Sequence, residues 1–98
     1  MLDITADLFD DDALIIENNQ AHKVSLCNQE GEPYLTVSFD ALLFGLWSPA
    51  KKNAPFVCIE PWYGRCDRET FTGDISEREW GIALAAGESF YAEYTITV

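Results

Sequence analysis

Hydrophobic and polar residues alternate along much of the chain with a period of two, the pattern of a β-strand with one buried face. The longest such run is residues 90–98 (FYAEYTITV), and residues 24–27 and 35–39 alternate in the same way. The intervening segment 28–33 (NQEGEP) is rich in turn residues. We therefore expect a hairpin over residues 24–39 and a C-terminal strand over residues 90–98.

Shorter apolar runs at residues 13–17 and 56–60 predict two further strands, and Leu2 and Ile4 begin a strand-like pattern. Helical signals are few. The best is residues 74–80, where Ser76 would cap one or two turns. Residues 87–88 predict a tight turn before the last strand, and residues 49–55 an exposed loop. The pattern predicts an all-β protein, an antiparallel β-sandwich of roughly six to eight short strands forming a single domain over residues 1–98.

A sheet of so few strands leaves edges with unpaired backbone groups. Either association into a homo-oligomer or a complementing N-terminal segment would cover these edges. We expect one of the two.

Composition and charge exclude several classes of function. The 98 residues carry a net charge of −11, with too few lysines and arginines to neutralise phosphates, so we expect no nucleic-acid partner and no anionic membrane partner. No apolar run is long enough to cross a bilayer, and the acidic N-terminus does not resemble a signal peptide, which favours a cytoplasmic protein. Three cysteines without CxxC spacing and a single histidine, His22, predict free thiols, no metal site and no cofactor.

The stretch of residues 56–67 (FVCIEPWYGRCD) carries the clearest chemical signal. In an extended chain Phe56, Cys58 and Glu60 share one face, so we expect Glu60 to be held inward by apolar neighbours. Because proline removes a backbone donor, the strand should end at Glu60 and a loop should begin. Trp62 and Tyr63 could then lay a ring against the apolar face of a sugar.

Purely structural roles for the same residues compete with a sugar-binding role. Glu60 could be a buried carboxylate paired with Arg65 or Arg68, serving only to hold the loop. Trp62 and Tyr63 could be core aromatics. The acidic run at residues 10–12 is most simply a solvated turn, because it lacks the glycine and the terminal glutamate of a calcium-binding loop.

Residues 56–64 (FVCIEPWYG) resemble the C-terminal signature of the aldose 1-epimerase (galactose mutarotase) superfamily, and more closely its LacX-like branch. Other segments agree in order: LF at 8–9 with DDALI at 11–15, FGLWS at 44–48, and GESF at 87–90. The likeness spans nearly the whole chain and corresponds to the C-terminal part of such a domain. It implies that these residues form the last strands of a galactose-mutarotase-like β-supersandwich.

The resemblance also implies an isomerase of carbohydrate metabolism that interconverts the α and β anomers of an aldose, typically a hexose, without a cofactor. Glu60 matches the family's catalytic base, and Asp12 matches an aspartate that hydrogen-bonds sugar hydroxyls. The family's acid, a histidine, belongs to an N-terminal segment that His22 does not match. We therefore expect the chain alone to be a poor epimerase. The alternative is a non-catalytic β-sandwich module that binds a carbohydrate or a protein.

Overall fold

The computed structural model describes residues 1–98 and is built from strands, with one short 3₁₀ helix as its only helical element. None of its segments forms a helix with the length and apolar content needed to cross a lipid bilayer. The elements in chain order are β1 (Leu14–Ile16), β2 (Lys23–Cys27), β3 (Pro33–Phe39), β4 (Leu43–Trp47), β5 (Cys58–Trp62), η1 (Ile75–Glu77) and β6 (Tyr94–Thr97).

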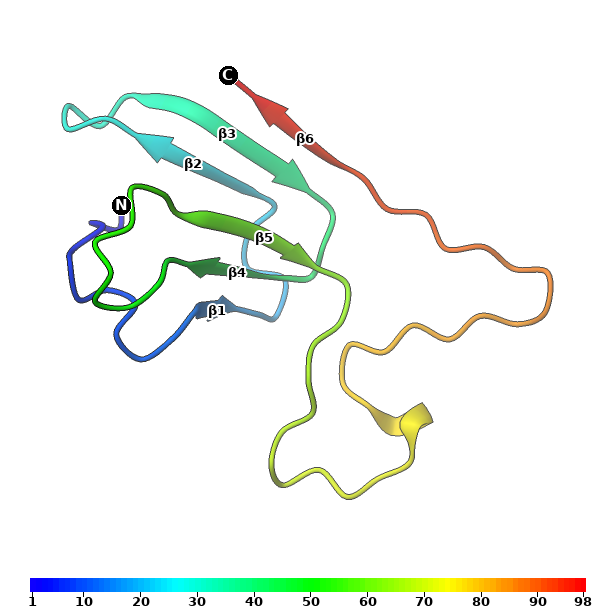
Figure 1. The fold of residues 1–98 in the computed structure, drawn as a ribbon. Helices are drawn as coiled ribbons and strands as arrows, with labels where there is room; N and C mark the ends of the chain where they lie inside the picture. Colours follow the sequence, from blue (N-terminus) through cyan, green and yellow to red (C-terminus); the bar gives the residue numbers. More distant parts are fainter.

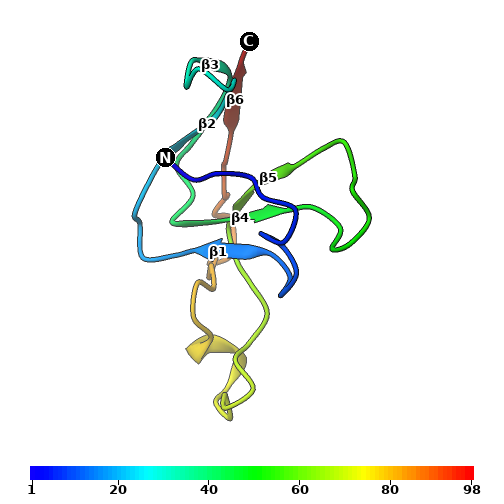
Figure 2. The same cartoon turned by 90° about the vertical axis from the view of Figure 1, so that its left-hand side faces the viewer.

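The six strands form two three-stranded antiparallel sheets, which confirms the prediction of a small all-β sandwich. One sheet, here called sheet A, has the order β1-β4-β5, and the other, sheet B, has the order β2-β3-β6. The short connection between β3 and β4 joins the sheets, and the strands of the two sheets run in different directions (Figures 1 and 2).

Sheet B has one apolar and one polar face, as its alternating sequence requires. The register pairs Val24 with Val37 and Val37 with Ile96, so these side chains share the face that turns toward sheet A. The opposite face is polar, and there the hydroxyls of Ser25 and Thr36 hydrogen-bond at 2.8 Å. The predicted hairpin of residues 24–39 is confirmed as the β2–β3 pair.

The core lies where β3 turns into β4. Four buried residues form it: Val37, Phe39, Ala41 and Phe44. The rings of Phe39 and Phe44 are 5.1 Å apart in a tilted arrangement. Half-buried side chains from both sheets pack around this cluster, among them Val24, Leu35, Leu46 and Ile59.

Much of the chain remains outside this core. Only 7 of 98 residues are buried, and the radius of gyration is 16.0 Å, whereas a compact domain of this length has about 13 Å. Two segments leave the body: a loop of residues 64–80, and the segment of residues 81–93 that leads to β6 (Figure 1). Every residue from 81 to 98 is exposed.

Several predicted boundaries were wrong. β5 does not end before Pro61 but continues to Trp62. An edge strand tolerates a residue without a backbone N–H, because half of its backbone groups face no neighbouring strand. The central strand β4 was not predicted. The C-terminal strand covers only Tyr94–Thr97 of the expected 90–98, and Leu2 and Ile4 lie in no strand.

The expected helical turn in residues 74–80 is a single 3₁₀ turn, and its N-cap is Asp74 rather than Ser76. Asp74 and Glu77 form a capping box. The turn at residues 87–88 is confirmed, because Glu88 donates its backbone N–H to the carbonyl of Ala85 and Gly87 has a φ of +84°.

Candidate functional site

Glu60 lies on the face of sheet A that turns away from the core cluster. Ile59 of β5 packs on the core, so its neighbour Glu60 points to the opposite side, together with Cys58 and Trp62. On β4 the same face carries Gly45, which pairs directly with Glu60, and Trp47. Glu60 is therefore half-buried on an aromatic face and does not point inward as expected.

The Trp62 ring is positioned by the absence of a side chain on Gly45. A Cβ atom added at Gly45 would lie 2.7 Å from one carbon of the Trp62 ring and 3.1 Å from another. The indole thus lies directly over the glycine of the neighbouring strand. From there its Nε1–H donates a hydrogen bond of 3.1 Å to Oε2 of Glu60. Residues two apart on one strand share a face, which is why β5 brings these two side chains together.

The ion pair proposed for Glu60 is not formed. Arg65 and Arg68 both bind Glu17, through Nη1–Oε2 at 2.6 Å and Nη2–Oε1 at 3.1 Å. No salt bridge includes Glu60, whose one side-chain partner is the Trp62 indole. A half-buried carboxylate without a cation partner is available to bind a proton or a hydroxyl group.

The arginines instead hold the loop of residues 64–80 against the end of β1. Arg68 also donates to Glu79 at 2.9 Å, and its hydrogen bonds to Glu17 and Glu79 raise the pKa of its guanidinium. Arg78 binds Asp67 at 2.7 Å and donates to the carbonyl of Arg65 at 3.0 Å. All three arginines of the chain are thus used in one network.

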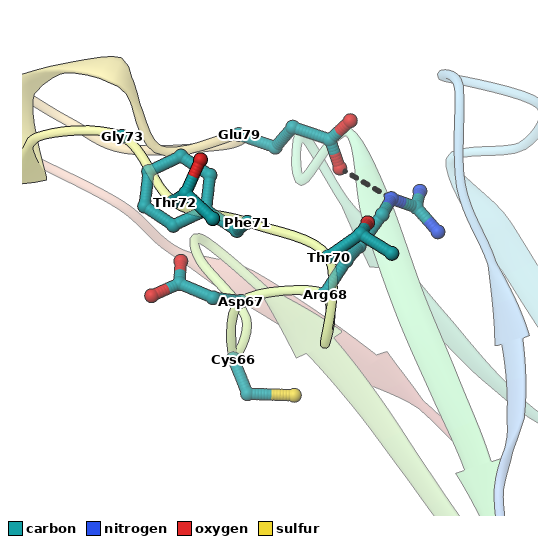
Figure 3. A pocket seen from close by; sticks show the side chains of 8 residues that line it. All are labelled: Cys66, Asp67, Arg68, Thr70, Phe71, Thr72, Gly73 and Glu79. Carbon is teal, nitrogen blue, oxygen red and sulfur yellow. Dashed lines mark hydrogen bonds and ion pairs between the residues drawn. The ribbon is translucent and has the colours of Figure 1, made fainter.

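A cavity of about 350 Å³ lies within this loop and not beside Glu60. Figure 3 shows it with Glu79 reaching toward Arg68. Its lining is mostly polar and consists of Cys66, Asp67, Arg68, Thr70, Phe71, Thr72, Gly73 and Glu79. No site residue predicted from the sequence lines it.

A smaller apolar groove of about 110 Å³ lies beside Trp62 and is also lined by Tyr63 and Trp80. Tyr63 packs against the core cluster, and its ring meets that of Phe90 edge-on at 5.4 Å. Trp80 has a φ of +61°, which is unusual for a bulky residue. Sequence reasoning missed both Trp80 and Gly45. A glycine inside an apolar run was the available signal for Gly45, whereas Trp80 had none.

The structure does not join Asp12 or His22 to Glu60. Asp12 precedes β1 in an exposed turn, with a φ of +83°, and its Oδ1 accepts the backbone N–H of Ala13 at 2.8 Å. His22 lies beside β3, where its Nδ1 is 3.1 Å from the carbonyl oxygen of Phe39. The three cysteines are free, and no cluster of three or more potential metal ligands is present.

A comparison with protein-family models finds no match, and comparisons with curated proteins and with solved structures find none either. The candidate site therefore rests on its own chemistry and on the motifs of the chain.

Proposed function

We propose that the chain is an aldose 1-epimerase-like protein of cytoplasmic carbohydrate metabolism, in which Glu60 is the base that accepts a proton from the anomeric hydroxyl of a hexose. One observation carries the proposal: Glu60 is half-buried on an aromatic face and hydrogen-bonded to Trp62, and no salt bridge includes it. The order of the motifs that resemble the family supports it further.

The geometry suits a general base. The Trp62 N–H holds one carboxylate oxygen of Glu60, which fixes the rotamer and leaves Oε1 without a side-chain partner. A sugar lying along this face would present its C–H groups to the aromatic rings of Trp62 and Trp47. General base catalysis by a well-placed carboxylate contributes about 10²–10⁴-fold to the rate.

The reaction needs two proton transfers. Glu60 removes the proton of the anomeric hydroxyl as the bond between the anomeric carbon and the ring oxygen breaks, and the ring oxygen takes up a proton. The open aldehyde then rotates and closes to the other anomer. Because the only histidine lies beside Phe39 in sheet B, water is the donor to the ring oxygen within this chain, and turnover is correspondingly slow.

Mutarotation measured by optical rotation tests this proposal. Freshly dissolved α-glucose or α-galactose should equilibrate faster with the protein than in buffer, and the increase should disappear in Glu60→Gln. The glutamine still offers an oxygen to the Trp62 N–H but is not a base. Glu30→Gln, at an exposed turn residue, is the matched control and should keep the wild-type rate. A rate equal to that of buffer, or one unaffected by Glu60→Gln, would remove the proposed catalytic role.

A second function, a non-catalytic module that binds a carbohydrate through the same face, is favoured by the position of His22, which lies beside β3 in sheet B and not on the Glu60 face of sheet A. It predicts saturable quenching or enhancement of tryptophan fluorescence by a hexose without any effect on mutarotation. Trp62→Phe should abolish the fluorescence change, whereas Trp80→Phe should leave it. Because Trp62 and Trp80 line one groove, this pair separates a sugar on the Glu60 face from one in the groove.

A further inference from the structure

The C-terminal segment concentrates the uncovered apolar surface of the molecule. Of fifteen exposed large hydrophobic residues, seven lie in residues 82–98, and they include Tyr94, Ile96 and Val98 at 62%, 55% and 96% exposure. Tyr94 and Ile96 pair with the buried Phe39 and Val37 and so share their face. The apolar face of sheet B therefore continues onto β6 but has no layer above it there.

The amount of exposed surface is large enough to support a stable interface. The chain exposes 7631 Å², whereas a compact monomer of 11.0 kDa exposes about 5,600 Å². The excess, about 2,000 Å², belongs to the whole chain, and an interface that buried half of it would reach the roughly 1,000 Å² per partner at which obligate dimer interfaces begin.

The two sheets have four edges, and three of them carry features that discourage further pairing. β1 has only three residues. β2 carries Lys23 and a register irregularity between Leu26 and Cys27. β5 contains Glu60 and Pro61. β6 has none of these: its residues are uncharged, it contains no proline, and one of its two sides has no neighbour.

We propose that β6 pairs antiparallel with β6 of a second copy of this chain across a two-fold axis. The product is a continuous six-stranded sheet with the order β2-β3-β6-β6-β3-β2. An axis perpendicular to the sheet keeps the apolar faces of both halves on the same side, which extends one hydrophobic surface across the interface.

Side-chain alternation restricts the register. Residues opposite each other must point to the same face, so the axis lies midway between the two copies of one residue, which then pair with each other. With the axis at Ile96, the two Ile96 side chains face each other, and Tyr94 faces Val98 of the second copy. With the axis at Thr95, Glu93 would instead enter the paired region opposite Thr97. We assign the Ile96 register because it matches apolar with apolar and leaves the acidic residue outside.

Light scattering coupled to size exclusion tests the association on the intact chain. A micromolar concentration series at about 0.15 M salt limits repulsion between two acidic chains, since the Debye length is then ~8 Å. The expected mass is twice the 11.0 kDa of the chain. A folded monomer throughout the series would overturn the proposal.

Cysteine cross-linking tests the register in a background where Cys27, Cys58 and Cys66 are replaced by serine. Ile96→Cys should oxidise to a disulfide-linked dimer, because facing side chains at the axis come within reach of a disulfide. Thr95→Cys, which faces Thr97 of the other copy, is the matched control and should cross-link far less. The reverse ranking, or equal cross-linking of both, would overturn the Ile96 register.

Lysine substitution provides an independent check. Ile96→Lys should shift the mass to that of the monomer, whereas Tyr34→Lys, at a similarly exposed position outside the β3–β6 pairing, should not. Should Ile96→Lys not fold, hydrogen exchange of wild-type residues 94–98 decides the matter. Protection that rises with protein concentration supports pairing, and protection independent of concentration refutes it.

Discussion

The contact between Gly45 and Trp62 predicts a large effect for the smallest possible substitution, Gly45→Ala. The added Cβ would lie 2.7 Å from the indole, and contacts become ordinary only at 3.4 Å, so the ring must retreat by about 0.7 Å. Its hydrogen bond to Glu60 is already 3.1 Å long and would be lost. Overpacking costs about 1–3 kcal/mol and the lost hydrogen bond about 1 kcal/mol, so the expected loss of stability is about 2–4 kcal/mol.

Thermal and urea unfolding followed by circular dichroism measure this cost. For a domain of this size the lower end of this range, about 2 kcal/mol, corresponds to a fall in Tm of roughly 8–16 °C. The control is Gly64→Ala, where the new Cβ would lie 3.8 Å from its nearest neighbour, the carbonyl oxygen of Trp80. It should change the stability by less than about 0.5 kcal/mol.

A double-mutant cycle tests whether the destabilisation by Gly45→Ala arises from the contact with Trp62. In a Trp62→Leu background the ring is absent, and Gly45→Ala should then cost almost nothing, which gives a coupling energy of at least about 1 kcal/mol. The reasoning fails if Gly45→Ala lowers the free energy of unfolding by no more than Gly64→Ala does. It also fails if Gly45→Ala lowers it equally with and without the Trp62 indole.

The ion-pair network and the C-terminal segment give two further predictions. Glu17→Ala should destabilise the fold by about 1–3 kcal/mol and speed hydrogen exchange in residues 64–80, because Arg65, with 14% of its side chain exposed, loses its carboxylate. Glu79→Ala, which removes only an exposed pair, should cost less than about 1 kcal/mol, and equal effects would contradict the assignment. The hydrogen bond from Tyr91 to Glu93 raises the pKa of the phenol, so any stability from this pair is present below the unfolded pKa and is lost as pH rises through the folded one. Ultraviolet titration should show one tyrosine ionising late, and Glu93→Gln should restore its ordinary titration.

The hairpin of sheet B was predictable because its signals are local. Period-two alternation and a turn sequence determine β2 and β3, and tertiary contacts only extend them. β4 was missed for the opposite reason. Its run LFGLW does not alternate, and its central glycine weakens the strand signal, although Gly45 is there to accommodate Trp62.

The candidate site was half predictable. The choice of Glu60 and Trp62 followed from their positions in the sequence, but Pro61 was taken as the end of the strand, which hid the fact that the two side chains share a face. The pairing of Glu17 with Arg65 and Arg68 joins residues 48 and 51 positions apart, and no local pattern reports such a contact. Because the sequence does not reveal the contacts of Arg65 and Arg68 with Glu17, the two arginines were natural partners to propose for Glu60.

The central claim, that the Glu60 face of sheet A binds an aldose, is tested most directly by the indole N–H resonance of Trp62. A ¹H–¹⁵N spectrum resolves the three tryptophan indoles, and Trp62→Phe assigns the relevant one. Titration with glucose or galactose should shift this signal in a saturable manner, because the indole donates to the carboxylate that we propose receives the sugar hydroxyl. Glu60→Gln should weaken the binding. A Trp62 signal that does not move up to the solubility limit of the sugars would contradict the claim.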